Sequence, residues 1–497
     1  MVLGTSSHVG KSLLVTALCR IFARRGVRVA PFKSQNMSLN SSATVEGLEI
    51  GRAQALQAEA AGVVATVDMN PILLKPSGDM TSQVVVRGKI WGTLSAADYH
   101  LRRVEELMPV VRASYEALAA EYEVVILEGA GSPAEINLKE HDIVNMRMAE
   151  MADARCLLVG DIDRGGVFAA LLGTVELLEP EERERIAGFA INKFRGDVGL
   201  LEPGVRMIEE RLGRLCLGVV PYLHGLTLEE EDSLGLPPVE SRAWDADESA
   251  GRTLRVAVVA LASFSNFTDF DALRAEGSVS LRFCRSVEQM TGADVIVLPG
   301  SKQTVDDLEW LRASGIASYL AGYGGLVVGI CGGMQMLGVE IMDPLGMERV
   351  GVVQGLGLLP IRTEMRGWKV TRLVEGEMVS STLFGQRMEG MAVSGYEIHI
   401  GETTYLEGTR PFALIAGHWD GCVSEDGRVV GTYLHGVFDG DGFRHAFLGA
   451  ARAYRGLAPV AGMTDWKGMR EASLERLADA VEEALDIPTL FAWAGVA

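Results

Sequence analysis

GTSSHVGKS, residues 4–12, stands between an apolar stub at residues 1–3 and a helical pattern over residues 11–25. Glycines in such a loop let successive backbone N–H groups face a phosphate, and the start of the helix adds positive potential. The lysine can reach the outer phosphates and the following serine can ligate Mg²⁺. The loop is one residue longer than the usual G-x-x-x-x-G-K-[ST], and a chance G-K-S is the alternative in a chain with 58 glycines. The strand-turn-helix setting favours a nucleoside triphosphate site, formed by Gly4, Thr5, Gly10, Lys11 and Ser12.

Beyond this loop, short apolar strands alternate with helical patterns through the first half of the chain. The predicted strands cover residues 27–32, 123–127, 155–160, 186–191 and 216–220, and the predicted helices include 11–25 and 51–62. This alternation predicts right-handed crossovers and a mostly parallel sheet with both faces covered. Because a central strand usually needs about five residues, we expect the natural chain to begin several residues before the stub.

Composition restricts the class of protein. The chain has 497 residues, which at about 150 per domain predicts several domains. A hydrophobic share of 48% excludes global disorder, and a formal charge of −20 argues against a nucleic-acid partner. Six cysteines without a C-x-x-C pair, and no signal segment, favour a cytoplasmic protein. The apolar run at 324–342 is interrupted by six glycines, Gln335 and Glu340, so we expect a buried strand and helix there and no membrane partner.

The periodic pattern breaks between the two halves of the chain. Residues 233–252 are acidic and contain Pro237-Pro238, which favours a domain linker over an ordinary surface loop. We therefore expect one domain over 1–232 and a second over 253–497. In the second domain, buried strands are predicted at 254–260, 294–298, 326–330 and 429–433, with antiparallel strands around 363–404.

Polar residues after the predicted strands supply partners for the phosphate loop. Glu128 ends a strand at the sheet edge where ligands of parallel sheets gather, so we expect Glu128 and Ser12 to hold Mg²⁺. A solvated carboxylate is the alternative for Glu128. Asn192 ends another strand and could read an adenine edge, or it could simply belong to a turn.

A second polar group follows the strand at 27–32. Lys33 there could place a positive charge beside the γ-phosphate, where an acidic acceptor would have to lie. The expected acceptor and phosphate residues are Lys33, Gln35 and Asn36, with Asp142 and Asp163 as weaker candidates for the same crevice.

The second half carries VVGICGGMQ, residues 327–335, in which a strand runs through Cys331 into a helix. Glycines on both sides permit the strained turn that exposes a nucleophile, and a helix start favours the thiolate. A buried structural cysteine is the alternative. His435 is the expected base, with His399 as its competitor, and either could instead be a hydrogen-bonded core histidine. An oxyanion hole is predicted from the N–H of Gly332 and one near Gly300, which together indicate acyl transfer through a thioester.

A phosphate loop followed by the GICGG and YLHG motifs resembles the cobyric acid and cobyrinate a,c-diamide synthase family of amidotransferases, over nearly the whole length. The resemblance implies an α/β protein: an N-terminal dethiobiotin-synthetase-like P-loop domain and a C-terminal class I glutaminase-like domain. QNMSLNS at 35–41 favours the cobyric acid synthase branch. GYEIH at 395–399 is shared among such glutaminase relatives and implies that Tyr396 and Glu397 belong to the glutamine site.

The activity implied by the resemblance is ATP-, Mg²⁺- and glutamine-dependent amidation in cobalamin biosynthesis. The implied acceptor is a corrinoid polycarboxylate, adenosylcobyrinic acid a,c-diamide, amidated at its b, d, e and g carboxylates. A shielded route for ammonia between the two halves is expected with it. Oligomeric state stays open, a homo-oligomer included.

One departure concerns the orientation of His435. Ordinary class I glutaminases carry a glutamate two residues after the catalytic histidine, and here that position is Val437. Glu397 and a backbone carbonyl are candidate substitutes, and the sequence does not decide what orients His435. Two rival functions remain: the same chemistry on another polycarboxylate, and a P-loop regulatory ATPase with an inert glutaminase-like module. A stand-alone cysteine hydrolase would leave the phosphate loop unexplained.

Overall fold

The N-terminal stub is strand β1 (Val2–Gly4), which lies inside a parallel sheet. It pairs with β10, and a parallel bridge from Val2 to Glu128 joins it to the pair β2–β9. The computed structural model describes residues 1–77, 81–95, 97–99, 103–228, 244, 253–380, 382–460, 462 and 464–496. The strands of this sheet are, in spatial order, β2 Val29–Phe32, β9 Val124–Leu127, β1, β10 Cys156–Asp161, β11 Ile186–Phe194 and β12 Leu215–Pro221.

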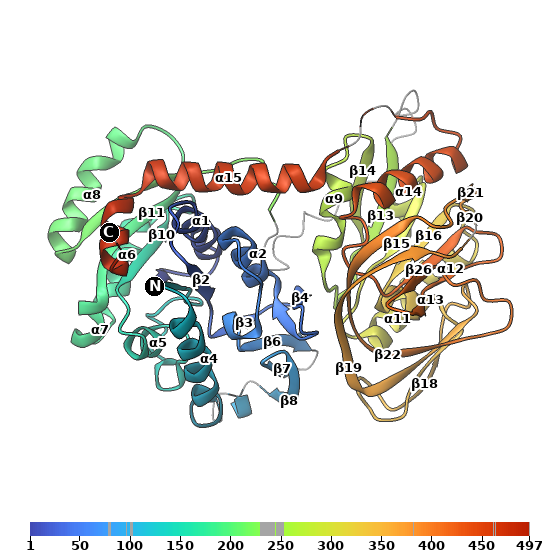
Figure 1. Cartoon of the computed structure of the whole chain (residues 1–497), viewed down its shortest axis with the longest axis horizontal. Helices are drawn as coiled ribbons and strands as arrows, with labels where there is room; N and C mark the ends of the chain where they lie inside the picture. The colour runs from blue at the N-terminus through green and yellow to red at the C-terminus, as the bar shows by residue number, and fades with distance from the viewer. Residues whose placement is uncertain are drawn as a thin grey trace.

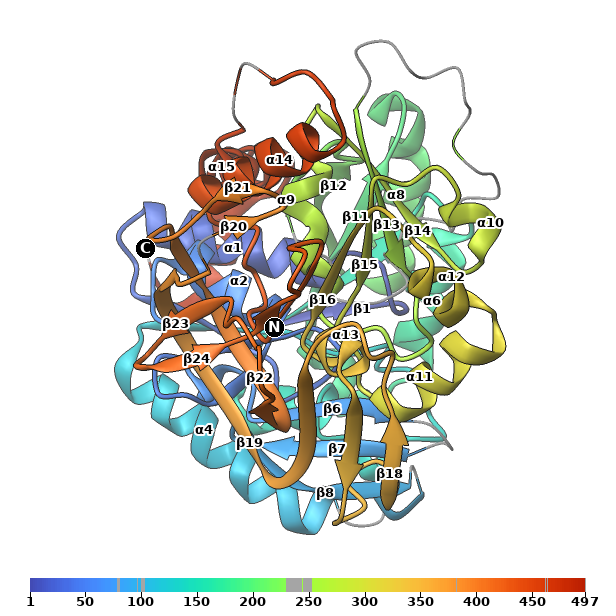
Figure 2. The same ribbon diagram turned by 90° about the vertical axis from the view of Figure 1, so that its right-hand side faces the viewer.

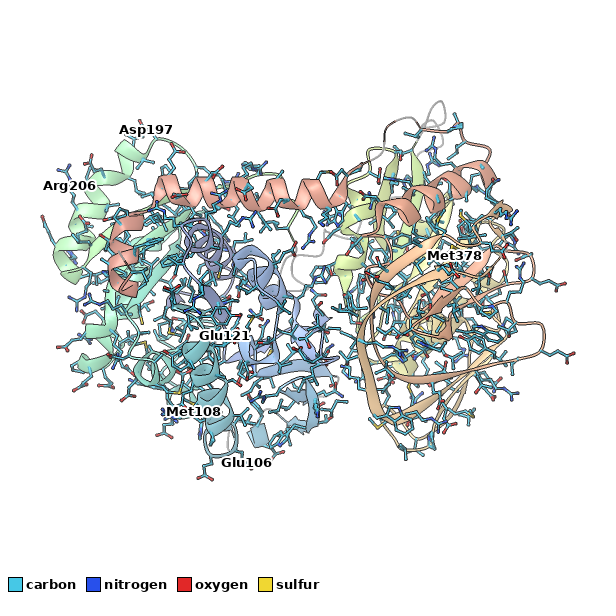
Figure 3. All side chains as sticks on the ribbon, in the orientation of Figure 1. Glu106, Met108, Glu121, Asp197, Arg206 and Met378 are labelled. Atoms are coloured by element: carbon cyan, nitrogen blue, oxygen red, sulfur yellow. The ribbon has the colours of Figure 1, made fainter. Side chains whose placement is uncertain are left out.

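Helices lie around this sheet in the first lobe of the molecule (Figure 1). They are α1 Lys11–Arg24, α2 Arg52–Ala61, α4 Met108–Glu121, α5 Met146–Met151, α6 Val167–Glu176, α7 Pro180–Arg185 and α8 Val198–Leu212. The sheet agrees with the strands expected from the sequence to within a few residues at each end. Helix α8, which carries Asp197 at its N-cap and Arg206, lies at the end of the first lobe farthest from the second (Figure 3).

A smaller sheet in the first lobe was not expected from the sequence. It contains β3 Gln35–Met37, β6 Ile72–Ser77, β7 Thr81–Val86 and β8 Lys89–Ser95, and a hairpin of β4 Ser41–Ala43 and β5 Glu49–Gly51 lies beside it. Strand β3 runs parallel to β6, whereas β6, β7 and β8 are antiparallel. These elements extend the first lobe toward the second (Figure 1).

The second lobe has two sheets. The first is mostly parallel and contains, in spatial order, β14 Val279–Cys284, β13 Leu254–Val259, β15 Val295–Leu298, β16 Leu326–Ile330, β26 Val429–Thr432 and β25 Cys422–Val423. The second sheet contains β18 Gly351–Gln354, β17 Glu340–Asp343, β19 Ile361–Met378, β22 Ala392–Tyr405, β23 Ala413–Ile415 and β24 His418–Asp420. Its long strands β19 and β22 pair antiparallel, as expected for residues 363–404, and are prominent in Figure 2.

The remaining elements of the second lobe are short. They are η5 Phe267–Phe270, α9 Asp271–Arg274, α10 Val287–Met290, α11 Thr304–Ala313, α12 Ile316–Ala321, α13 Gly332–Leu337, the hairpin β20 Thr382–Leu383 and β21 Gln386–Arg387, and α14 Asp441–Tyr454. The linker expected at 233–252 lies outside the described residues apart from Trp244, which is buried in the core of the second lobe.

The last two helices correct the expected second domain of 253–497. Helix α15 (Trp466–Ala484) leaves the second lobe and crosses the first, and α16 (Ile487–Ala494) ends there (Figure 1). Arg20 and Arg24 of α1 pair with Glu475, and Phe22 stacks on Phe491 with ring centroids 4.1 Å apart. The C-terminal segment therefore belongs to the core of the first lobe, because its apolar face completes the cover of α1.

Candidate active site

Cys331 occupies a strained turn between β16 and α13. Its backbone has φ 49° and ψ −109°, a region that non-glycine residues rarely adopt, and the side chain is almost fully buried. A Cβ on Gly333 would lie 1.9 Å from the carbonyl oxygen of Leu298, so the turn packs tightly against the end of β15 and requires glycine. This is the strand-turn-helix setting expected for a nucleophile.

His435 lies beside this thiol and is held by a carboxylate that the sequence analysis missed. Its Nδ1 is 2.7 Å from Oδ2 of Asp269, and the Gly436 N–H donates to the other oxygen of Asp269 at 2.9 Å. All three groups are buried. Burial alone would lower the pKa of His435, but the Asp269 carboxylate, with a smaller contribution from Cys331, raises that pKa to about 10.

Asp269 replaces the two substitutes expected for the missing glutamate. It belongs to η5, 166 residues before His435 in the chain, and no local pattern in that turn marks it as a partner. Glu397 points elsewhere, because its carboxylate pairs with Arg372 and lies 3.7 Å from Nε2 of His399. The expectation that Glu397 or a backbone carbonyl orients His435 is therefore wrong.

His399, the competing base, takes a structural position. Its Nδ1 is 2.8 Å from the carbonyl oxygen of Gly401, and its ring stacks on Tyr433 with centroids 3.7 Å apart. Tyr396 does lie at the site, because its ring stacks on His435 with centroids 5.4 Å apart and the two backbones exchange hydrogen bonds. These contacts leave His435 as the histidine that interacts with Cys331.

The two glycines expected near an oxyanion also lie here. A Cβ on Gly300 would lie 3.0 Å from Cε1 of His435, and one on Gly332 would lie 2.9 Å from the backbone nitrogen of Ser301. Gly332 opens α13, where the first backbone N–H groups have no acceptor within the helix. The loop after β15 and the start of α13 therefore meet beside the thiol, which is the arrangement needed to stabilise an oxyanion.

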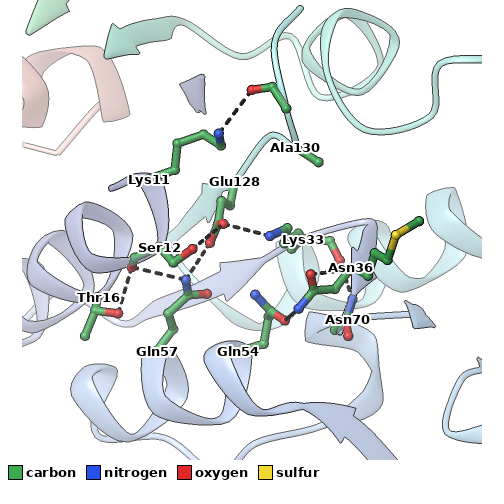
Figure 4. Close-up of polar contacts among 12 residues, drawn as sticks. Lys11, Ser12, Thr16, Lys33, Asn36, Gln54, Gln57, Asn70, Glu128 and Ala130 are labelled. Carbon is green, nitrogen blue, oxygen red and sulfur yellow. Dashed lines mark hydrogen bonds and ion pairs between the residues drawn. The ribbon is translucent and has the colours of Figure 1, made fainter. Parts of the chain in front are cut away.

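In the first lobe, the phosphate loop and the strand ends form one polar cluster (Figure 4). Ser12 donates from Oγ to Glu128 at 2.8 Å, and the Nζ of Lys33 lies 2.9 Å from the same carboxylate oxygen. The other oxygen accepts from Gln57 of α2 at 2.6 Å. Lys11 donates to the carbonyl oxygens of Ser6 and Gly131 at 3.0 and 3.1 Å, so its Nζ lies between the phosphate loop and the segment after β9.

The loop continues into a cavity of about 740 Å³. Thr5 anchors the loop through a backbone bond to Val159, and Gly10 follows with φ 96°. The Nδ2 of Asn192 donates to the carbonyl oxygen of Val9 at 2.8 Å, and Asn192 also lines the cavity. Other lining residues are Lys11, Ser12, Tyr222, His224 and, from α15, Leu477 and Val481.

The expected acceptor residues separate into two groups. Asn36 donates to Gln54 of α2 at 3.0 Å and lies near the Glu128 cluster (Figure 4). Gln35 accepts a hydrogen bond from Tyr99 at 2.6 Å. Asp142 does not join them. Its carboxylate accepts from the backbone N–H groups of Val144 and Asn145 at 2.9 and 3.0 Å before α5, which gives it a turn-stabilising role.

The Ser12–Glu128 pair fits the chemistry of Mg²⁺. A hydroxyl and a carboxylate 2.8 Å apart offer hard oxygen ligands, and Mg²⁺ usually combines one or two such groups with substrate phosphates and water. Among the described residues, no cluster of three or more His, Cys, Asp or Glu side chains could hold a metal by itself. The ion would therefore depend on the nucleotide for its remaining ligands.

Two hydrogen bonds cross the lobe interface between segments near the two polar sites. The Phe267 N–H donates to Oδ1 of Asn40 at 3.1 Å, and the Ser41 N–H donates to Oδ1 of Asn266 at 3.0 Å. Asn266 and Phe267 lead directly into the turn that carries Asp269. The chain segment after β3 thus touches the segment that orients His435.

Comparison with known proteins matches both halves. The CobQ/CobB/MinD/ParA nucleotide binding domain family matches residues 1–234, and the CobB/CobQ-like glutamine amidotransferase domain family matches residues 255–443. The cobyric acid synthase of Moorella thermoacetica is 48% identical over 100% of this chain and 97% of its own length. That of Sorangium cellulosum is 50% identical over 98% of this chain and 96% of its own. Among the described helices, none is both long and apolar enough to cross a membrane.

Proposed function

Because this chain belongs to the cobyric acid synthase family, we propose that it is a glutamine-dependent ligase that converts carboxylates of a corrinoid into amides with ATP. The acceptor we propose is adenosylcobyrinic acid a,c-diamide, amidated at its b, d, e and g carboxylates. The observation that carries the proposal is the buried Cys331–His435–Asp269 arrangement in one lobe, joined through its interface to the Lys11–Ser12–Glu128 cluster of the other.

The second lobe would release ammonia from glutamine. His435 takes the thiol proton, and the Cys331 sulfur attacks the side-chain amide carbon of glutamine. The backbone N–H groups around Gly332 and Ser301 stabilise the oxyanion that forms. His435 then gives its proton to the departing nitrogen, which leaves as ammonia, and water hydrolyses the thioester to glutamate and restores the thiol. Asp269 holds the imidazole in position throughout.

The first lobe would make the acceptor carboxylate reactive. A carboxylate oxygen attacks the γ-phosphorus of ATP, and the bond from that phosphorus to the β-phosphate oxygen breaks. ADP departs, and the acceptor carboxylate becomes an acyl phosphate. Ammonia then attacks the acyl carbon and phosphate departs, so each amide uses one ATP and one glutamine. Lys11, which bonds to carbonyl oxygens of the loop region, and Lys33, which lies beside Glu128, balance the phosphate charge from the loop and from the strand end. Ser12 and Glu128 would hold Mg²⁺, which supplies charge neutralisation on the phosphates.

Incubation with ATP, Mg²⁺, glutamine and the corrinoid, followed by mass spectrometry, tests this function. Each amidation lowers the mass by the difference between a hydroxyl and an amino group, so the products count the converted carboxylates. A parallel reaction with cobyrinic acid separates the proposed acceptor from another polycarboxylate. Absence of amide product with both acceptors, while glutamine is left intact, would favour the regulatory ATPase.

A further inference from the structure

The cavity beside the phosphate loop has one apolar wall. The lining of this space of about 740 Å³ continues from the loop to Leu13, Leu226 and Leu228. All three leucines are half-buried, so the core leaves part of their apolar surface uncovered. Leu13 lies in the first turn of α1, and the other two belong to residues 222–228, which follow β12. We call Leu13, Leu226 and Leu228 the apolar wall.

The polar side chain of Asn192 lines the same cavity, but the protein already uses both ends of its amide. Its Nδ2 donates to the carbonyl oxygen of Val9 at 2.8 Å, and its Oδ1 accepts from the Lys193 N–H at 2.9 Å. These bonds tie the end of β11 to the phosphate loop. The apolar wall is therefore the surface of this cavity that favours a flat, weakly polar group.

Helix α15 holds the apolar wall in place. The Thr227 N–H donates to Oγ of Ser473 at 3.1 Å, and the two hydroxyl oxygens lie 2.6 Å apart. Arg476, one turn later, donates to the carbonyl oxygen of His224. Leu226 and Leu228 pack against the core cluster that contains Leu477 of the same helix. The position of residues 222–228 thus depends on α15.

The support of the apolar wall comes from the far end of the chain. Helix α15 lies outside both matched families, which cover residues 1–234 and 255–443. It begins at the second lobe, where Trp466 is buried in the core and Arg444 donates to the carbonyl oxygen of Thr464 at 2.6 Å. From there it crosses the first lobe (Figure 1). Neither family match accounts for this contribution to the cavity.

Resting on the use of ATP proposed above, we propose that the apolar wall receives the base of the nucleotide and that Ser473 and Arg476 of α15 are positioning residues for it. The faces of a base are flat and weakly polar, and they lose water when they lie against apolar side chains. The phosphates are held separately, by charge and by backbone N–H groups of the loop. Affinity for the base and affinity for the phosphates are therefore separable in this chain.

The test compares the binding of ATP with that of inorganic triphosphate, each with Mg²⁺, by calorimetry on the full chain. The wild type should bind ATP more tightly than triphosphate. Leu226→Ala should raise the Kd for ATP several-fold and leave the Kd for triphosphate unchanged, because only the base contacts the apolar wall. Leu172→Ala is the matched control: Leu172 of α6 is also a half-buried leucine of the first lobe, but it lies outside the cavity lining. It should leave both values at those of the wild type.

The positioning role of α15 has its own readout. Ser473→Ala should raise the KM for ATP and leave kcat at saturating ATP unchanged, because the phosphates and the acceptor keep their sites. Ser473→Thr, which keeps the hydroxyl that Thr227 contacts, should restore the KM.

If Leu226→Ala does not fold, Leu228→Ala gives the same readouts. Equal weakening of ATP and triphosphate in either folded variant, or an equal loss of ATP affinity in Leu172→Ala, overturns the proposal. So does a wild type that binds ATP no more tightly than triphosphate. A wild type that shows the expected preference for ATP but forms no amide on the corrinoid overturns the proposed function and leaves the base site standing.

Discussion

Asp269 orients His435 in the thiol site, and no sequence pattern predicted this contact. Cys331 and His435 were predictable because glycines bracket the thiol and a strand ends at the histidine. The third member comes from a turn 166 residues away, and a lone aspartate in such a turn carries no pattern of its own. For the same reason Glu397, which lies within the GYEIH motif, was considered as a substitute although it pairs with Arg372 instead.

Asp269→Asn tests this assignment. Losing the carboxylate that orients His435 should reduce glutamine-dependent turnover by about 10² to 10⁴-fold, the usual range for general acid–base catalysis. The pKa of His435, now about 10, should fall toward its ordinary value. The alkaline loss of glutamine hydrolysis should therefore begin at a lower pH than in the wild type. Initial rates of glutamate release against pH measure this, with ammonium-dependent amidation as the unchanged reaction.

Glu397→Gln provides the comparison for that profile. Because Glu397 pairs with Arg372 and lies near His399, its loss should leave the alkaline limb in place. A shift in Glu397→Gln without one in Asp269→Asn would contradict the assignment.

The raised pKa of His435 also makes folding stability depend on pH. The pair with Asp269 stabilises the fold fully below about pH 6.5 and loses this contribution as the pH rises through about 10.

At the scale of elements, the sequence predicted the sheets better than it predicted where the terminal helices pack. Strands of the parallel sheets read as continuous apolar runs, so β10, β11, β13 and β16 were found with small errors at their ends. The amphipathic pattern of α15 shows that one face is buried, but it does not say which of two cores that face covers. The smaller sheet was missed because β3 has only three residues and β6, β7 and β8 mix polar with apolar residues, so none of them is a continuous apolar run.

Phe491→Ala tests the return of the C-terminal helices. Phe491 of α16 stacks on Phe22 in the core of the first lobe, and a truncation of this kind costs about 3–5 kcal/mol. We expect the first lobe to unfold at a lower denaturant concentration, with loss of nucleotide binding before loss of glutamine hydrolysis. Val350→Ala, at an exposed position of the second lobe, should leave both transitions unchanged. If Phe491→Ala instead destabilised the second lobe alone, the placement of α16 would be wrong.

At the scale of the whole molecule, the proposed function divides two reactions between two lobes that share an interface. The segment after β3 binds the turn before Asp269, Glu49 of β5 pairs with Lys369 of β19, and α15 spans both lobes (Figure 1). In the proposed function the thiol acts only on glutamine, whereas the phosphate loop acts on every acceptor. Single substitutions at the thiol and in the phosphate loop should then affect different steps of amidation.

Cys331→Ser and Lys11→Ala should therefore differ in which nitrogen source still supports amidation. Cys331→Ser removes the thiolate but leaves the phosphate cluster intact, so we expect glutamine-dependent amidation to be lost and amidation with high added ammonium to continue at the wild-type rate. Lys11→Ala removes the cation at the mouth of the loop and should abolish amidation with either nitrogen source. Amide formation measured with each source separates the two lesions, and circular dichroism confirms that both variants are folded. Failure of folded Cys331→Ser with ammonium would mean that the lobes do not divide the chemistry, because the acyl phosphate would then also require the thiol.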